Sequence, residues 1–146
     1  MINNSKKIGK VGKSMVISNN LKIPAETPIY LSRSNEYHMK KKHKYEYDKH
    51  LNDIPQILEN PDFVELNVKK SSLNYYKKID KCNYYLKVSS RGTNVNHIQF
   101  ARTMHIISNK KMLKLYESGN AKIVNENVNI KELRDKCQTH SKNKPI

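Results

Sequence analysis

The sequence predicts an α+β fold, in which N-terminal helices pack on a four- to five-stranded antiparallel meander sheet. Two observations lead to this prediction. Helical patterns come first, between residues 34 and 58, and adjacent strand patterns follow, between residues 63 and 107. Separate runs of helices and strands are typical of α+β domains, because a parallel sheet needs a crossover between successive strands. The length of 146 residues favours one domain.

Three segments are expected along the chain. Residues 1–13 are polar, basic and contain two glycines, which predicts a basic flexible arm. Residues 14–137 are expected to form a single α+β domain, and residues 138–146 a tail. No apolar run approaches the roughly 20 residues of a transmembrane helix, and the first residues lack the apolar stretch of a secretory signal. We therefore expect a cytoplasmic protein that does not bind membranes.

The helical patterns lie in the first half of the chain. Residues 29–31 predict a short strand, which leads into a basic helix that Ser32 or Ser34 caps and that ends near residue 44. A second helix is predicted over residues 48–58, whose apolar side chains recur at helical spacing. Pro55 indicates a kink there, or the first turn of a separate short helix.

Alternation of apolar and polar residues marks the strands. It is clear over residues 84–89 and longest over residues 97–107, which predicts a central antiparallel strand. Residues 110–117 fit either a helical turn or a strand, and residues 128–137 predict a terminal helix. In the central strand, one face is expected to carry Ile98, Phe100, Arg102, Met104 and Ile106, and the other Gln99, Ala101, Thr103, His105 and Ile107.

The chain is strongly basic. It has 28 Lys and Arg against 13 Asp and Glu, a formal net charge of +15. The excess of Lys over Arg, 24 to 4, and the 18 Asn are typical of an AT-rich genome, which enriches Lys without selection for binding. A charge this far from zero still attracts polyanions. Nucleic acid is therefore the expected partner, ahead of a membrane surface or a merely solvated surface.

Several chemistries are not favoured by the motifs. The chain lacks GxxxxGK[ST], GxSxG, HExxH and the carboxylate cluster of a two-metal nuclease. Cys82 and Cys137 are 55 residues apart, a spacing that predicts neither a disulfide scaffold nor a zinc knuckle, and reduced thiols suit the cytoplasm. Nothing in the spacing recommends a zinc site from His38, His43 and Cys82. We expect no metal and no cofactor.

Histidines and lysines gather between residues 38 and 50, in the sequence HMKKKHKYEYDKH. Histidine moves protons near neutral pH, and lysines attract phosphate. On one helix His38 and His43 would lie about 140° apart, so they share a site only if the helix ends or bends near Lys42. A solvated basic helix explains the local pattern slightly better.

A second group of polar residues lies on the predicted strands. Arg102 interrupts an apolar series, so its charge must be paired, extended into solvent or functional. Thr103 and His105 share the opposite face, and Lys87 lies on the preceding strand. A guanidinium and an imidazole on a sheet beside a basic helix suit a phosphodiester. Pairing of Arg102 with a carboxylate explains the pattern equally well.

The segment from residue 29 to about residue 124 resembles the phage-associated branch of the barnase, EndoU, colicin and RelE-like nucleases, abbreviated PBECR. The similarity lies in IYLSRSNEYHMKKKH, LNDIPQILENPDFV and HIQFARTMHII. The resemblance implies an α+β nuclease fold and RNA cleavage without a metal. It implies catalytic roles for five residues, and the chain departs from the barnase pattern in having no obvious acidic general base. These five are His38, His43, Arg102, Thr103 and His105.

The implied function is a metal-independent endoribonuclease, with tRNA among its candidate substrates, acting as a toxin or an effector of a phage or mobile element. One histidine would take the proton of a ribose 2′-OH, which attacks the phosphorus, and a second would protonate the leaving oxygen. The alternatives are a non-catalytic nucleic-acid-binding protein and a protein that binds an acidic partner, such as an inhibitor. Expected substrate-binding residues are Lys41, Lys42, Lys44, Tyr45 and Lys87.

Overall fold

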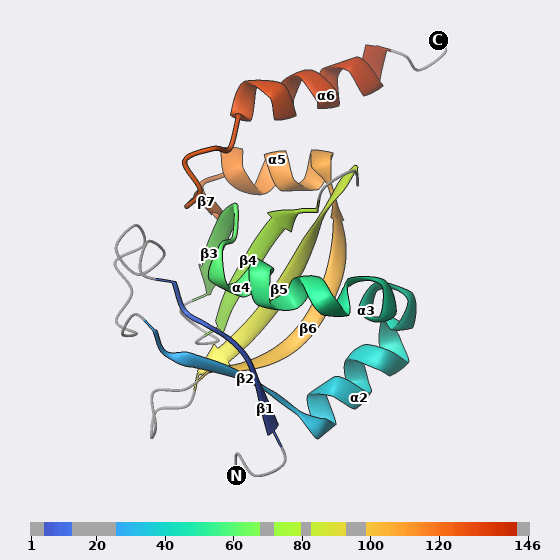
Figure 1. Ribbon diagram of the computed structural model, residues 1–146. Coiled ribbons are helices and arrows are strands. Elements are labelled where there is room, and N and C mark those ends of the chain that lie inside the picture. The colour runs from blue at the N-terminus through green and yellow to red at the C-terminus, as the bar shows by residue number, and fades with distance from the viewer. Residues whose placement is uncertain (1–4, 13–25, 68–71, 80–82, 93–98, 143–146) are drawn as a thin grey trace.

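The computed structural model describes residues 5–12, 26–67, 72–79, 83–92 and 99–142. Over these residues, one sheet lies between two groups of helices (Figure 1). The elements, in chain order, are β1 (Ser5–Lys10), β2 (Pro28–Ser32), α2 (Arg33–Lys42), α3 (Lys44–His50), a 3-10 turn (Leu51–Asp53), α4 (Ile54–Glu59), β3 (Phe63–Asn67), β4 (Ser72–Lys78), β5 (Tyr84–Gly92), β6 (Gln99–Ser108), α5 (Asn109–Glu117), β7 (Lys122–Ile123) and α6 (Ile130–Lys142).

The sheet has seven strands among the described residues, in the order β1-β2-β6-β5-β4-β3-β7. The predicted α+β class is confirmed, but the predicted four- to five-stranded, purely antiparallel sheet is wrong. Strands β3 to β6 are antiparallel neighbours in chain order, whereas β2 pairs parallel with β6 through Ile29 and Tyr30. Three helices and three other strands separate β2 from β6 in the chain, so no local sequence pattern predicts their pairing.

The predicted flexible arm over residues 1–13 contains a strand instead. Residues Ser5–Lys10 form β1, which pairs antiparallel with β2, and Val11 is fully buried. Gly12 is required by packing, because a Cβ there would lie 2.9 Å from the backbone oxygen of Glu59. The glycines of this segment therefore allow β1 to approach α4 closely. At the other end, α6 continues to residue 142, past the predicted boundary at 137.

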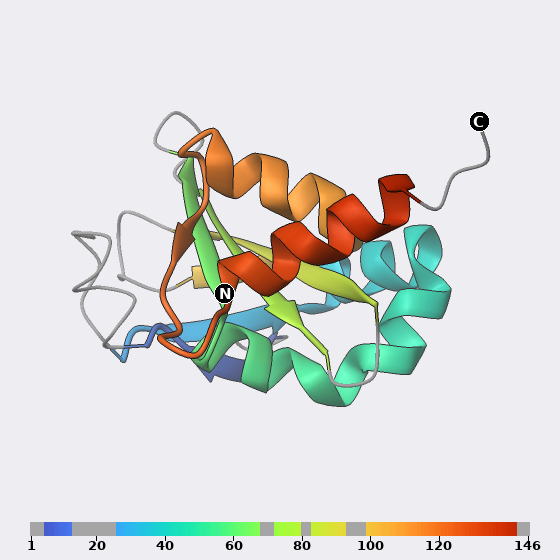
Figure 2. The same cartoon turned by 90° about the horizontal axis from the view of Figure 1, so that it is seen from above.

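The two faces of the sheet carry separate apolar clusters, and α4 and α5 lie on opposite sides of the sheet (Figure 2). The first face packs on helices α2–α4, and the second packs at one end on α5 and α6. In the first cluster, the helices contribute Met39, Tyr47, Ile54, Ile57 and Leu58, and the sheet contributes residues such as Leu86, Val88 and Met104. The second contains Phe63, Tyr76, Tyr85, Ile107, Met112, Ala121 and Leu133.

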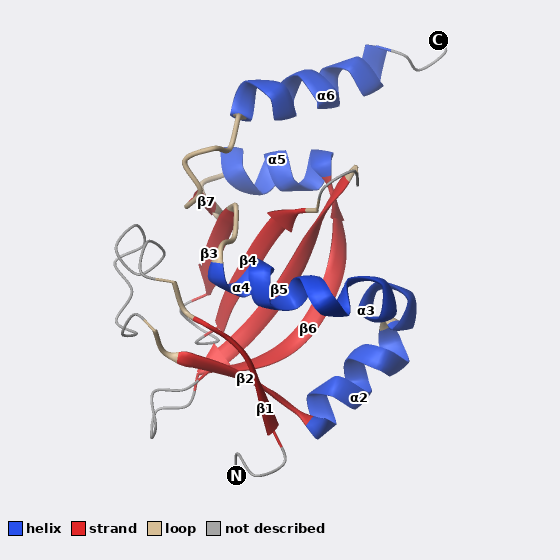
Figure 3. Ribbon diagram, viewed as in Figure 1, coloured by secondary structure: helices blue, strands red, loops and turns tan. Residues whose placement is uncertain are grey.

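The helices are shown in Figure 3, and they match the predicted boundaries in part. Ser32 is the N-cap of α2, and its side chain accepts the backbone N–H of Asn35 at 3.1 Å, which confirms one of the two predicted caps. The helix predicted over residues 48–58 is divided into α3, a 3-10 turn and α4. Pro55 lies in the first turn of α4, where its missing N–H costs nothing. Among the described residues, every helix is too short or too polar to span a bilayer.

Strand β6 departs from the predicted alternation at Arg102. The register pairs Ser89 with Thr103 but Ser90 with Ala101, so Arg102 is the extra residue of a β-bulge. Arg102 is exposed, while Ala101 is fully buried in the first cluster. The bulge therefore removes Arg102 from the apolar face on which the sequence pattern put it. The start of the predicted strand, residues 97 and 98, lies outside the described residues.

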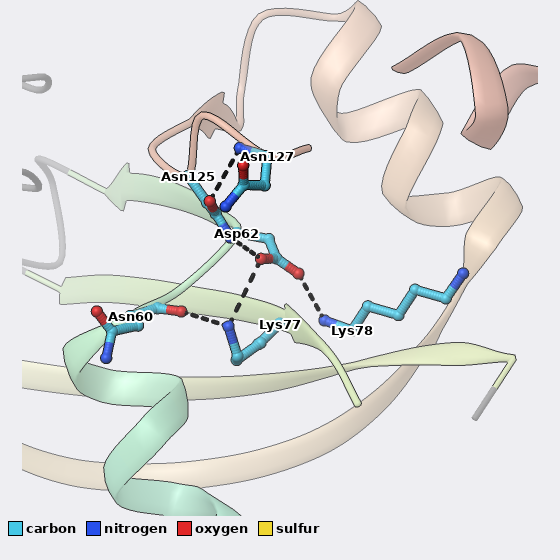
Figure 4. A network of polar contacts seen from close by, with 6 residues as sticks. All are labelled: Asn60, Asp62, Lys77, Lys78, Asn125 and Asn127. Atoms are coloured by element: carbon cyan, nitrogen blue, oxygen red, sulfur yellow. Dashed lines mark hydrogen bonds and ion pairs between the residues drawn. The ribbon is translucent and has the colours of Figure 1, made fainter. Parts of the chain in front are cut away.

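A buried carboxylate joins the strands at the β3 edge (Figure 4). Asp62, which is 8% exposed, accepts the backbone N–H of Lys78 and the side-chain amide of Asn125, each at 2.9 Å. Lys77 is also close, because its Nζ lies 3.7 Å from Asp62 Oδ1. The same Nζ donates a hydrogen bond to the carbonyl of Asn60 at 2.7 Å. These partners offset the cost of burying the charge, and they fix β3 against β4 and the segment after β7.

Candidate active site

His43 occupies the corner between α2 and α3, which lie beside β6 (Figure 1). Its backbone N–H closes α2 by donating to the carbonyl of Met39 at 2.8 Å, but its own φ of −136° and ψ of 49° are not helical. Helix α2 thus ends after Lys42. A helix end at this position is the condition under which His38 and His43 could share a site. The break turns the chain so that the His43 ring meets the second face of the sheet at His105.

The two imidazoles are in contact. The ring centroids of His43 and His105 are 4.4 Å apart, and the rings meet edge to face at 78°. His43 Nδ1 lies 3.0 Å from Glu46 Oε2. Because a carboxylate accepts hydrogen bonds, Nδ1 carries the hydrogen of this pair, which leaves Nε2 available to a substrate. Glu46 therefore orients His43 and sets its tautomer.

Lys87 is the direct cross-strand neighbour of His105, and Tyr76 of β4 is paired with Lys87 on the other side. We call Tyr76, Lys87 and His105 the Lys87 row. The Lys87 ammonium lies 6.0 Å from the centroid of the Tyr76 ring. The row crosses three strands on the second face and ends at His43, so a lysine and two histidines converge.

The pKa of His105 is lowered from its ordinary value of 6.5. The largest cause is burial, followed by the positive charges of His43 and Lys87, with Glu46 acting in the opposite direction and Lys111 adding to the decrease. Burial and like charges both disfavour the imidazolium. His105 is consequently neutral at neutral pH and able to accept a proton.

A second polar row lies next to the first on the same face. Glu65, Asn74, Ser89 and Thr103 are paired in register across β3, β4, β5 and β6, and we call them the Glu65 row. All four are partly exposed. Ser89 Oγ donates to Asn74 Oδ1 at 2.7 Å, and Asn74 Nδ2 donates to Glu65 Oε1 at 2.8 Å. The second face is thus polar and open beside the histidines.

Of the predicted site residues, the structure brings His43, Lys87 and His105 together, with Thr103 in the adjoining row. His38 is exposed on α2, where its ring meets Tyr37 edge-on at 6.0 Å. Arg102 is exposed at the bulge. The predicted binding residues around the corner are also exposed. They are Lys41, Lys42, Lys44 and Tyr45.

Sequence reasoning missed Glu46 and Lys111 near the histidines, and Glu65 farther along the second face. Glu46 follows His43 by three residues, a spacing that places both on one side of a helix and could have suggested the pair. Glu65 reaches the second face only through the register of β3, β4 and β5. Lys111 has no local signal, because it approaches His105 through the turn from β6 into α5.

A groove of about 1280 Å³ lies between α5 and α6. Leu113, Lys114 and Arg134 line it, and it extends to Ser108 at the end of β6 and Lys111 in the first turn of α5. It includes neither histidine. We place the site at the histidines because the groups able to transfer protons converge there, while the groove offers mainly apolar and basic side chains.

No group of three His, Cys, Asp or Glu side chains converges as a metal ion would require, within the part of the chain that the structure describes. Cys82, one of the three residues weighed as zinc ligands, lies outside that part. Cys137 lies on α6 and is partly buried.

Comparison with known proteins adds a family to this geometry. Residues 6–114 match PBECR3, described as phage-Barnase-EndoU-ColicinE5/D-RelE like nuclease3. The match runs from β1 into α5 and contains His43, Lys87 and His105. No curated protein and no solved structure matches the chain. Because the match covers most of the 146 residues, the chain belongs to the PBECR3 family of phage-associated barnase-, EndoU-, colicin- and RelE-like nucleases.

Proposed function

We propose that the protein is a metal-independent endoribonuclease that uses His43, Lys87 and His105. The observation that carries the proposal is the contact between two histidines in different surroundings, with a lysine beside them. One histidine is held by a carboxylate, and the other has a lowered pKa. Neighbouring titratable groups in different surroundings are typical of an acid–base pair. Membership of a nuclease family supports a phosphodiester as the substrate.

The reaction needs only groups of this chain and of RNA. His105 takes the proton of a ribose 2′-OH, and the oxygen attacks the adjacent phosphorus. As the bond from O2′ to phosphorus forms, the bond from phosphorus to O5′ breaks, and His43 gives the proton on Nε2 to the leaving O5′. The Lys87 ammonium stabilises the negative charge on the non-bridging oxygens. The products are a 2′,3′-cyclic phosphate and a 5′-hydroxyl, and DNA is not a substrate because it lacks the 2′-OH.

The surface around the α2–α3 corner supplies a place for the rest of the RNA. Lys41, Lys42 and Lys44 are exposed beside His43 and suit backbone phosphates. Tyr45 is 63% exposed, and its hydroxyl accepts a hydrogen bond from Lys49 Nζ at 3.3 Å. An exposed ring held in one place suits stacking of an unpaired base. We therefore propose single-stranded RNA, including the loops of tRNA, as the substrate.

The biological role follows from such an activity. An enzyme that cuts cellular RNA acts in the cytoplasm and harms the cell that makes it, as expected of a toxin or phage-borne effector. A chain with a net charge of +15 would be neutralised by an acidic protein inhibitor, which could be attracted by the same field as RNA.

The test is cleavage of total RNA and of purified tRNA in the presence of EDTA, over a range of pH. The purified wild-type protein should cut both. His43→Ala, His105→Ala and Lys87→Met should each reduce the rate about 10²- to 10⁴-fold. His38→Ala is the matched control, because it removes an exposed histidine from helix α2 and should leave most of the activity.

Intact RNA at every pH, with protein that is folded by circular dichroism, would contradict the proposal. Tight binding of RNA without cleavage, unchanged in the histidine variants, would instead favour a nucleic-acid-binding module.

A further inference from the structure

The Glu65 row has an arrangement that the reaction itself does not require. Glu65 Oε1 accepts two hydrogen bonds, from Asn74 Nδ2 at 2.8 Å and from the hydroxyl of Tyr76 at 2.7 Å. Tyr76 is 1% exposed, so one of these donors is fixed in the second cluster. The carboxylate is thus held through one oxygen, and Glu65 itself is partly exposed. Its second oxygen, Oε2, can accept a hydrogen bond from a ligand.

The near end of this row, Ser89 and Thr103, lies within the length of one nucleotide from the Lys87 row, and Glu65 lies two strands beyond Ser89, about 10 Å across the sheet. Thr103 and His105 are two residues apart on β6, as are Ser89 and Lys87 on β5, so the two rows are separated by about 7 Å on one face. A phosphate held at Lys87 and His105 leaves its own nucleoside free to lie across the Glu65 row. Nothing but polar side chains stands in this row.

We propose that the Glu65 row recognises the base of the nucleotide that carries the attacking 2′-OH, and that Glu65 selects a base with an exocyclic amino group. The inference rests on the proposed function, because it assigns the substrate of the same site. A carboxylate oxygen accepts hydrogen bonds and offers none, so it pairs with the N4 amino group of cytosine. Uracil has a carbonyl oxygen at that position, which would face the carboxylate without a hydrogen bond. Cytidine is therefore preferred to uridine.

The experiment uses two short RNAs that are identical except for a single cytidine or uridine 5′ of one cleavable bond, with 2′-deoxyribose at every other nucleotide. Cleavage is measured in EDTA under single-turnover conditions with the full chain. The wild-type protein should cut the cytidine substrate about tenfold faster, as one base-edge contact to a carboxylate typically discriminates. A third substrate with pyrimidin-2-one, which is cytosine without its amino group, should react at the slow rate of uridine.

Glu65→Gln is the diagnostic variant. Glutamine can keep the bonds from Asn74 and Tyr76 through its carbonyl oxygen, while its NH₂ replaces the free acceptor with a donor. The preference for cytidine should disappear or reverse toward uridine. The faster of the variant's two cleavage rates, on the cytidine or the uridine substrate, should stay within a few fold of the faster wild-type rate. Glu117→Gln is the control, because it removes an exposed carboxylate on α5 and should preserve the cytidine preference.

The outcomes separate this inference from the proposed function. Equal cleavage at cytidine and uridine by the wild type would overturn base selection and leave the nuclease intact. Loss of both reactions in folded Glu65→Gln would place Glu65 in the reacting machinery and would also overturn the inference. If Glu65→Gln fails to fold, the inference is tested by the rate at which the wild type cleaves the pyrimidin-2-one substrate. A rate equal to that for the cytidine substrate contradicts the inference. No cleavage of any substrate by the wild type would refute the function itself.

Discussion

His43 and His105 differ in surroundings although their rings are in contact. His43 faces the Glu46 carboxylate, whereas His105 is paired across the strands with the cation of Lys87. A positive charge on His43 disfavours a proton on His105. This asymmetry assigns the base to His105 and the acid to His43.

The assignment predicts a particular pH dependence. Because the pKa of His105 is lowered from 6.5, the base is protonated only when the pH falls below that value. The acidic limb of kcat/KM should therefore have its midpoint below 6.5, and proton NMR should give the same midpoint for the His105 ring. Lys87→Met removes a positive neighbour and should raise this pKa, while Lys122→Met, on a distant strand, should not. A His105 midpoint at or above 6.5 would contradict the assignment.

At the scale of residues, the candidate site could be predicted from the sequence in part. The histidine–lysine segment and the alternation on the late strands pointed to His43, Lys87 and His105. The sequence also predicts His38 as a site residue, because the sequence alone cannot decide between His38 and His43 until the end of α2 is known. Arg102 was named because alternation was extended through a bulge, and a bulge adds a residue without a reliable pattern.

The corner between α2 and α3 is the element on which the site depends. Glu36 of α2 accepts hydrogen bonds from the Tyr47 hydroxyl of α3 and from Lys6 of β1, the latter at 2.9 Å. Tyr47 is 1% exposed and packs in the first cluster. One carboxylate thus holds three elements together at the point where His43 must be presented to β6.

Removing this link should cost stability. Tyr47→Phe keeps the ring but removes the hydroxyl, so the free energy of unfolding should fall by about 2 kcal/mol at neutral pH, as for a hydrogen bond to a charged group. The hydrogen bond from Tyr47 is the first cause that lowers the pKa of Glu36 from 4.5. The stabilisation is therefore present above pH 4.5 and is lost as the pH falls through the pKa of Glu36 in the folded state.

Urea denaturation of wild type and Tyr47→Phe at pH 7 and near pH 3 measures both effects. Tyr37→Phe is the control, since Tyr37 is 61% exposed. An equal difference between wild type and Tyr47→Phe at both pH values would show that Glu36 is not the partner that matters.

Elements with a strong local signal were the ones predicted. The cap at Ser32, the Pro55 start of α4 and the alternation of β5 depend on neighbours in sequence. Strand β1 could not be predicted, because it is a short edge strand whose pairing partner, β2, is distant in the chain. The glycines near residue 12 were read as flexibility, whereas contact with α4 requires them.

For the whole molecule, the topology explains how residues far apart in sequence form one site. The α2–α3 corner brings His43 to the side of β6, and the central strands bring Lys87 and His105 into one row (Figure 1). The sequence predicted the fold class and the nuclease family. It could not predict the parallel β2–β6 pair. The helices and strands between β2 and β6 must pack before the two strands can meet. The net charge of +15 attracts RNA to this surface but does not locate the reaction.

The chemistry of the cut ends tests the central claim most directly. A short RNA is incubated with the protein in EDTA, and the fragments are identified by mass spectrometry. A matched RNA carries one 2′-deoxyribose at the cut site. The account predicts a 2′,3′-cyclic phosphate and a 5′-hydroxyl from the first RNA, and no cleavage at that bond in the second. Cleavage of the deoxy substrate, or fragments that carry a 5′-phosphate and a 3′-hydroxyl, would contradict attack by the 2′-oxygen.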